Sequence, residues 1–243
     1  MLKLINADLY KAFHRIYLFV FMAFMAAASI FVNAVLAHMK MPLEASIQMA
    51  LALLMYPLFF ISMFADIVTA EENKEHTLKN TISFGVSRTK LYLAKNISAI
   101  FVALNVAVVT LAVYFASAFL LLKPEKSDLS ALLSDFALRI AVVLLIYVAA
   151  VALATLLAAI IKRNALFTFA YFGLLIVPVL VFKLLKLVNP VFGRIQNGML
   201  FMQSQIVAVT PQSQLMTTVW IALAHIVVFT GLGIVLFKRQ EIN

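Results

Sequence analysis

Six apolar segments, each long enough to cross a bilayer, divide this chain and restrict its fold more than any other feature. An α-helix rises about 1.5 Å per residue, so about 20 apolar residues cross the ~30 Å hydrocarbon layer. We therefore predict six membrane-spanning helices joined by short connections. The expected spans cover residues 16–37, 45–68, 97–122, 136–161, 165–185 and 215–237, with the fifth kinked or loosened near Pro178.

Composition supports a membrane protein rather than a soluble one. Of the 243 residues, 65% are hydrophobic and only 12% are charged. Soluble domains carry roughly 25% charged and about 45–50% apolar residues. A domain of this size cannot hide so much apolar surface from water, so its solvent must be lipid. We expect one all-α integral membrane domain over residues 1–243.

Several kinds of chemistry lack their usual residues here. The chain has no cysteine, which excludes disulfides and thiolate metal sites. It also has no phosphate-binding Gly-x-x-x-x-Gly-Lys-Ser/Thr loop and no Gly-x-Ser-x-Gly elbow. The four histidines are scattered without ligand spacing. We therefore predict neither an enzyme nor a metal or cofactor site in this chain.

The positive charges predict an orientation in the membrane. If both termini are cytoplasmic, twelve of the nineteen Lys and Arg residues lie inside and seven lie outside. An even number of spans also places both ends on the same side. The net charge of +9 then reflects topology, and we expect no nucleic-acid partner. The chain should be a multi-pass protein of the cytoplasmic (inner) membrane.

Two segments outside the spans are also apolar in part. Residues 1–15 place apolar side chains at helical spacing between charged ones, which predicts a helix lying in the membrane interface. A plain polar lead-in is the alternative. Residues 189–214 are apolar but are interrupted by Gly and Pro, so we expect short re-entrant helices that dip into the outer leaflet before the last span.

A charged segment over residues 69–95 separates the second and third spans. Glu75 and Lys79 are spaced i,i+4, and Leu78 and Ile82 would share one helical face. Gly85 suits the left-handed end of a helix. Ser87 would cap the helix that follows. We predict a short helix parallel to the membrane whose apolar face fits a groove on a soluble protein. A solvated hairpin that only connects two spans is the alternative.

This segment resembles the loop of ABC-2-type transporter permeases. In that family, acidic residues after the second span are followed by a Gly-Thr-(Leu/Ile)-Lys pattern, a Ser-x-Gly-(Val/Ile)-Ser-Arg turn and a Lys. Here the matching residues are Glu72, residues 77–80, residues 83–88 and Lys95. His76 stands where the family usually has Gly before the Thr. The order of interfacial helix, spans and outer apolar segment is also similar to that family.

The resemblance implies the membrane subunit of an ATP-driven exporter. Two such subunits would enclose the pathway, and separate cytoplasmic ATPase subunits would hold ATP and Mg and contact the loop helix. The expected coupling residues are Glu71, Glu72, Thr77, Leu78, Lys79, Thr81, Ile82, Phe84, Gly85, Ser87 and Arg88. In the family the second and fifth spans usually line the path. On these spans Gln48, Ser62, Thr168 and Tyr171 are the candidate path residues.

The spans give only a general indication of the substrate. Their central portions carry no charge, which argues against a proton relay or an ion site. Eleven Met and twenty-one Phe fit a hydrophobic or amphipathic cargo, such as a small peptide, an antibiotic or a lipid. A secondary transporter or channel that works without ATP is the alternative. Gly231 and Gly233 would allow close helix contact, within the bundle or at a dimer seam.

The predicted topology can be tested by labelling single cysteines, because the natural chain has none. Asn80→Cys should react with an impermeant maleimide only after the cytoplasmic side is opened. Ser127→Cys should react in intact cells, because it lies in the loop expected outside. The reverse pattern of labelling would overturn the orientation.

Overall fold

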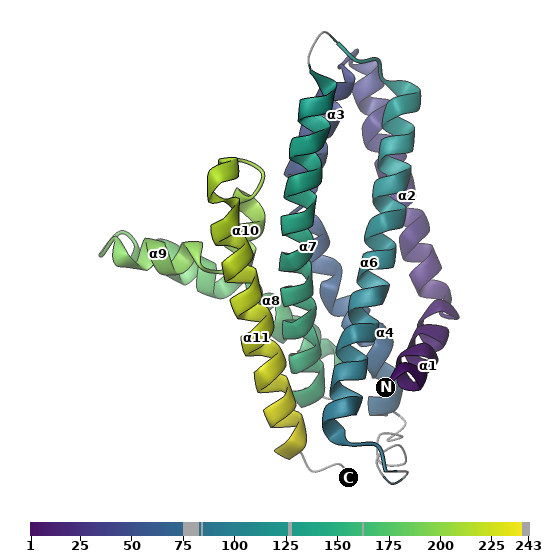
Figure 1. The fold of residues 1–243 in the computed structure, drawn as a ribbon, viewed down its shortest axis with the longest axis vertical. Helices are drawn as coiled ribbons and strands as arrows, with labels where there is room; N and C mark the ends of the chain where they lie inside the picture. The colour runs from purple at the N-terminus through teal and green to yellow at the C-terminus, as the bar shows by residue number, and fades with distance from the viewer. Residues whose placement is uncertain (75–82, 84, 126–127, 162, 240–243) are drawn as a thin grey trace.

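The computed structural model describes residues 1–74, 83, 85–125, 128–161 and 163–239, and these residues form a bundle of helices (Figure 1). Five helices are long and apolar enough to cross a membrane, and the number rises to six if a bent pair counts as one span. This confirms the prediction of an all-helical multi-pass protein.

The five long helices lie close to the predicted spans. Two of them begin earlier than expected, at Arg88 and at Leu129, because capping residues precede them. Helix α8 runs as one element through Pro178, and the kink or loosening that we expected there stays a prediction. The five helices are α2 (Ile16–His38), α6 (Arg88–Leu121), α7 (Leu129–Ile160), α8 (Asn164–Leu185) and α11 (Leu215–Arg239).

Side-chain caps set the two early starts. The Ser87 Oγ accepts a hydrogen bond from the Lys90 backbone N at 3.4 Å, which confirms the predicted cap of α6. Asp128 accepts hydrogen bonds from the side chain and backbone of Ser130 and from the backbone N of Ala131 at the start of α7. These hydrogen bonds hold the pKa of Asp128 below its usual value.

The second span is broken near its middle. Helix α3 (Leu43–Leu53) is followed by the short 3₁₀ helix η1 (Tyr56–Phe60) and then by α4 (Ile61–Lys74). The two parts are bent by 41° where we expected one span. Pro57 lies in the break, where it has no N–H to continue the helical ladder. This segment is thus a bent span or a re-entrant loop.

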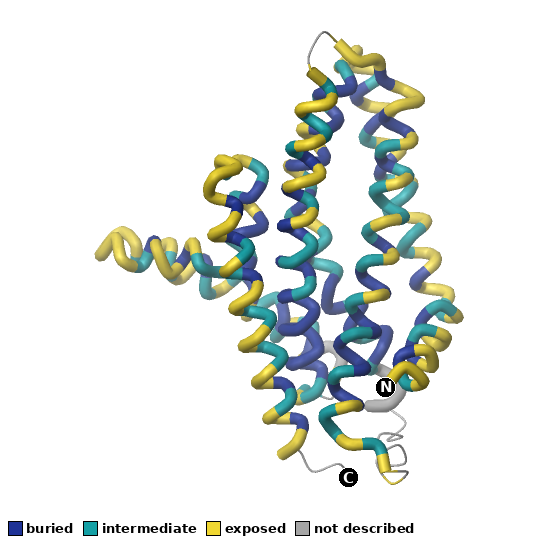
Figure 2. Tube along the Cα trace, in the orientation of Figure 1, coloured by how far each residue is buried: buried dark blue, intermediate teal, exposed yellow. Residues whose placement is uncertain are grey.

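Helix α7 forms the centre of the bundle. It packs against α3, α4, α6, α8 and α11 and also against the outer helix α10 (Leu200–Ile206). In its most apolar stretch 72% of the residues are buried, whereas the corresponding value for α2 is 17%. Figure 2 shows this contrast along the two helices. A helix that is apolar on all sides is expected in the core of the fold.

The N-terminal helix α1 (Leu2–Phe13) lies against α4 and α6 at the end of the bundle that also holds the end of α11 (Figure 1). Its buried face carries Ile5, Asp8 and Ala12, which share a helical stripe. Leu2 and Tyr10 remain exposed. The predicted helix is therefore present, but its buried stripe contains a charged residue. Its placement in the membrane interface stays a prediction.

The segment before the last span contains the expected short helices. They are α9 (Val191–Asn197), α10 and η2 (Gln212–Gln214), and Figure 1 shows α9 projecting from the bundle. Helix α10 packs against α7, α8 and α11, whereas α9 packs mainly against α8. Their position in the outer leaflet stays a prediction, because the structure contains no membrane.

Arg139 on α7 holds this outer segment in place. Its Nη1 donates hydrogen bonds to the backbone carbonyls of Val207, at 2.5 Å, and Thr210, at 2.8 Å. Its Nε pairs with Asp135 at 2.7 Å, and Gln212 donates to the same carboxylate at 2.6 Å. The i,i+4 pair at residues 135 and 139 is thus structural, and it satisfies carbonyls that follow the last turn of α10.

Gly233 allows α11 to approach α6 closely. A Cβ at this position would lie 1.9 Å from the Tyr92 hydroxyl oxygen, whereas a Cβ at Gly231 would meet no atom within 4 Å. Tyr92 is only 2% exposed and packs beside Phe237, so its ring has little room to move. The sequence left open whether these glycines contact a helix of the same bundle or a second subunit. Gly233 contacts Tyr92 of the same bundle.

Gly233→Ala should destabilise the protein by about 1–3 kcal/mol through overpacking against Tyr92. Gly231→Ala is the matched control on the same helix, and it should be neutral or stabilising because Ala is the better helix former. Thermal unfolding in detergent, followed by size-exclusion chromatography, measures both. Equal stability of the two variants would contradict the close contact.

Candidate functional site at the base of the bundle and the break in the second span

A buried ion pair joins three elements at the base of the bundle, where α1 lies. The Lys95 Nζ on α6 lies 2.6 Å from the Asp8 Oδ1 on α1, and both side chains are less than a tenth exposed. The same Nζ donates to the Val68 carbonyl on α4 at 3.2 Å. Ser98 adds a long hydrogen bond to Asp8 at 3.5 Å. The pair therefore connects α1, α4 and α6.

The burial of this pair makes it a strong geometric constraint. Two charges taken out of water are tolerated only when they are paired and their remaining donors and acceptors are bonded. Asp8 and Lys95 meet this condition through Ser98 and the Val68 carbonyl. Separating α1 from α6 would leave both charges without this pairing. The three elements should therefore move as one body.

The start of α6 has a second attachment. Gly85 adopts a left-handed φ of 85°, as the sequence predicted for a turn, and Ser87 then caps α6. The Arg88 Nη1 donates to the Lys238 carbonyl near the end of α11 at 2.8 Å. Residues 85–88 therefore lead directly into a helix that is fixed on two sides.

The predicted coupling residues are only partly described. Glu71 and Glu72 lie in the last turns of α4. Gly85, Ser87 and Arg88 lie at the start of α6, as predicted. Their contact with an ATPase stays a prediction. Thr77, Leu78, Lys79, Thr81, Ile82 and Phe84 lie outside the described residues.

Two tyrosine hydroxyls bond to carbonyls at the break in the second span. Tyr147 on α7 donates to the Leu54 carbonyl just after α3 ends. Tyr171 on α8 donates to the Leu58 carbonyl within η1 at 2.8 Å. A broken helix in lipid must find other partners for the backbone groups that it frees. These hydroxyls provide such partners, and thereby attach the break to the fourth and fifth spans.

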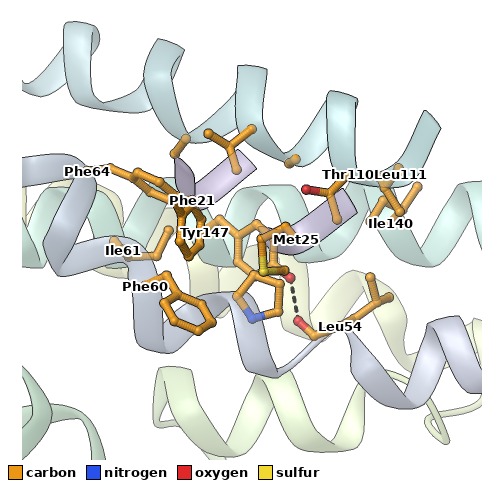
Figure 3. A pocket seen from close by; sticks show the side chains of 14 residues that line it. Phe21, Met25, Leu54, Phe60, Ile61, Phe64, Thr110, Leu111, Ile140 and Tyr147 are labelled. Carbon is orange, nitrogen blue, oxygen red and sulfur yellow. Dashed lines mark hydrogen bonds between the residues drawn. The ribbon is translucent and has the colours of Figure 1, made fainter. Parts of the chain in front are cut away.

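An apolar pocket lies directly beside the break (Figure 3). It lies between α2, the break, α6 and α7, with Phe21 and Met25 on one side and Tyr147 on another. The pocket contains about 550 Å³ of space that is not filled by protein atoms, and this volume includes its open mouth. Its wall carries no charged side chain. The Tyr147–Leu54 hydrogen bond forms part of that wall, so the pocket and the break share structure.

The four candidate path residues lie apart from this pocket. Gln48 is exposed on α3, Ser62 is buried on α4, and Thr168 is partly buried on α8. Tyr171 is fully buried, and its hydroxyl bonds the break rather than facing open space. The structure thus gives Tyr171 a structural role, and the transport role of all four stays a prediction.

A buried polar network joins α2, α3 and α6 further along the bundle. The Asn33 Nδ2 donates to the Tyr114 carbonyl and to the Ser117 Oγ, each at 2.8 Å. Ser46 donates to the Asn33 Oδ1 at 2.7 Å, and the Tyr114 hydroxyl donates to the Ser46 carbonyl at 2.8 Å. The polar residues within apolar spans were the only sequence signal for this network.

The break and the base are also positions that sequence reasoning missed. Lys95 was expected near the end of the polar segment, and Asp8 was one of the charged residues between the apolar ones of the expected interfacial helix. The only signal in the sequence that Asp8 is buried was its helical spacing. It lies three residues after Ile5 and four before Ala12, so the three residues share one face of α1. Its partner on α6 could not be inferred from that spacing.

Comparison with known families identifies the kind of protein. A model of the ABC-2 family transporter proteins matches residues 4–172, which include most of α1, the broken span, α6 and α7. The chain belongs to this family. No curated protein matches it. This ABC-2 protein is therefore the membrane subunit of a transporter, and ATP hydrolysis lies in the partner ATPase.

The buried charged groups of the described residues all have partners within the protein. Asp8 and Lys95 pair with each other, and Arg139 pairs with Asp135 and bonds to backbone carbonyls. Glu44 accepts hydrogen bonds from the backbone N of Glu125. These charged groups therefore hold elements of the bundle together.

Lys95→Met should destabilise the protein by about 3–5 kcal/mol, because it leaves the Asp8 carboxylate buried without its cation. The double variant Asp8→Asn, Lys95→Met removes both charges and should recover most of the loss. Lys90→Met is the matched control, since Lys90 is exposed on the same helix and should change stability by less than about 0.5 kcal/mol. Thermal unfolding in detergent measures all three. A single variant as stable as the natural chain would contradict the constraint.

Proposed function

We propose that this ABC-2 subunit is the permease of an ATP-driven exporter, and that the partner ATPase acts on it through residues 69–95. The observation that supports the proposal most is the Asp8–Lys95 pair beside the Val68 carbonyl. It connects both helices that flank the segment, so a force applied between them reaches α1, α4 and α6 together. A loose connecting hairpin would need no such attachment.

The break in the second span gives this movement a place to act. Helix α4 carries displacement from the base up to η1, where the helical ladder is interrupted and the chain bends. Segments joined by non-helical turns can change their angle without unfolding either helix. The hydroxyls of Tyr147 and Tyr171 couple the same point to the fourth and fifth spans. In our proposal, the break is the hinge between the base and the outer half of the bundle.

The cargo in this proposal is hydrophobic or amphipathic, such as a small peptide, an antibiotic or a lipid. Within the described spans, the buried charged residues are engaged in structural contacts. The pocket beside the hinge has a wall without charge. A cargo that carries a buried charge would need a fixed counter-charge on its route. An apolar cargo has no such need.

A second permease subunit completes the proposal. Helices α2, α8 and α11 are long and apolar, and less than a fifth of the most apolar stretch of each is buried. Lipid or another subunit must cover these faces. A homodimer or a heterodimer with a related permease would enclose a path that one bundle alone does not.

Leu78→Asp combined with Ile82→Asp should abolish association with the ATPase and the stimulation of its activity, because the two substitutions charge the expected apolar face. Asn80→Asp is the control for position, since it adds one negative charge on another face of the same expected helix. Both are measured by co-purification from native membranes and by ATP hydrolysis in proteoliposomes. Unchanged complex formation by the double variant would contradict the contact, and transport in liposomes without ATPase would contradict an ATP-driven exporter.

A further inference from the structure

The space beside the break extends beyond the pocket in Figure 3. A second hollow adjoins it, with about 760 Å³ of unfilled volume including its mouth. The two hollows share five wall residues, so they are parts of one cavity that runs along α2 in the middle of the bundle. The shared residues are Met25, Leu54, Pro57, Thr110 and Leu111.

The sequence accounts for the cavity. The bend at residues 54–60 moves the second span out of line, and small side chains on the facing helices do not fill the gap. Ala28 on α2 and Ala103 and Ala107 on α6 line the space. Protein interiors are normally packed to the density of organic crystals, so space left open between spans is available to an occupant.

The wall determines what the occupant can be. It carries no charged side chain, and its hydroxyls are mostly engaged within the protein, as those of Tyr147 and Tyr114 are by carbonyls. Thr110 is the exception among the wall hydroxyls that are shielded from solvent, because its Oγ1 has no hydrogen-bond partner among the described residues. An ordered water needs two to four polar partners, and this wall does not supply them. The apolar, uncharged wall is therefore suited to binding a hydrocarbon chain.

The cavity also has an opening to the surroundings of the bundle. Tyr56, which lines the second hollow, is 48% exposed at the rim. The wall residues lie in the middle of α2 and α6, two helices that qualify as membrane spans. Hydrocarbon chains therefore surround this rim when the protein is in a bilayer. We propose that the cavity binds one hydrocarbon chain of an amphiphile, inserted laterally between α2 and the break.

This site has a structural consequence for the break. A chain in the cavity contacts Leu54 and Pro57, so it fills the space into which the bent span could otherwise collapse. The occupant thereby supports the bend. The chain can belong to a membrane lipid or to an amphiphilic cargo, since both present the same hydrocarbon. Binding needs neither ATP nor the ATPase, so it stands independently of the exporter proposal.

The test is photo-crosslinking of the full chain in liposomes without ATPase. One arm uses phosphatidylcholine with a diazirine in one acyl chain, and the other uses diazirine-labelled palmitic acid. Both should label peptides of α2 and α6 that contain Met25 and Thr110. Labelling by the phospholipid assigns the site to membrane lipid, and labelling by the free acid alone assigns it to single-chain amphiphiles. Absence of labelling by both probes overturns the proposal.

Ala107→Phe should remove this labelling, because its side chain fills the cavity. Excluding even two methylene groups weakens binding roughly tenfold. Val108→Phe is the matched control, since Val108 is 64% exposed on the same helix and should leave the labelling unchanged. Equal labelling of the two variants would mean that only surface lipid reacts, and would overturn the site.

Two further variants test whether a loss of labelling comes from misfolding and whether the ligand forms hydrogen bonds. Ala107→Leu fills less space and should reduce the labelling while keeping thermal stability at least equal to that of the natural chain. Thr110→Val keeps the volume and should keep the labelling, because apolar contact holds the chain. Loss of labelling in Thr110→Val would show that a hydrogen-bonding ligand occupies the cavity, and would overturn the proposal of hydrocarbon.

Discussion

A backbone that lies in hydrocarbon has no water to bond, and the rest of this structure depends on that constraint. Continuous helices satisfy it internally, which is why long apolar stretches become α2, α6, α7, α8 and α11. Where the second span breaks, the tyrosine hydroxyls of α7 and α8 take over at the carbonyls of Leu54 and Leu58. Where the chain turns after α10, the Arg139 guanidinium donates hydrogen bonds to the carbonyls of Val207 and Thr210. At these two departures from regular helix, donors on neighbouring helices thus bond the freed carbonyls.

The same donors determine which parts of the bundle are connected. The Asp8–Lys95 pair joins α1, α4 and α6 at one end, and the Asn33 network joins α2, α3 and α6 further along. Between them lies the break, with an apolar cavity at its side. Two well-bonded regions are thus separated by a bend and a cavity, which is the arrangement that the proposed hinge requires.

Sequence reasoning predicted the helices and the family well, because both depend on local patterns. The Ser87 cap and the left-handed Gly85 were predictable from residue type, and the structure confirms them. The bend in the second span was not predicted, although Pro57 was a visible signal, because a proline in a membrane helix can also be accommodated without a break, as at Pro178. Tyr171 was a candidate path residue, yet its hydroxyl serves the break, since its partner lies 113 residues away.

By itself, the sequence determined that this chain is a helical membrane protein with a charged segment between its second and third spans, because hydropathy and helical spacing are properties of neighbouring residues. Only the tertiary structure decided which charges pair and where the cavity forms. Asp8 and Lys95 are separated by 87 residues, and no local pattern relates them. Their pairing follows from the packing of α1 against α6, which brings two buried charges to a distance at which each satisfies the other.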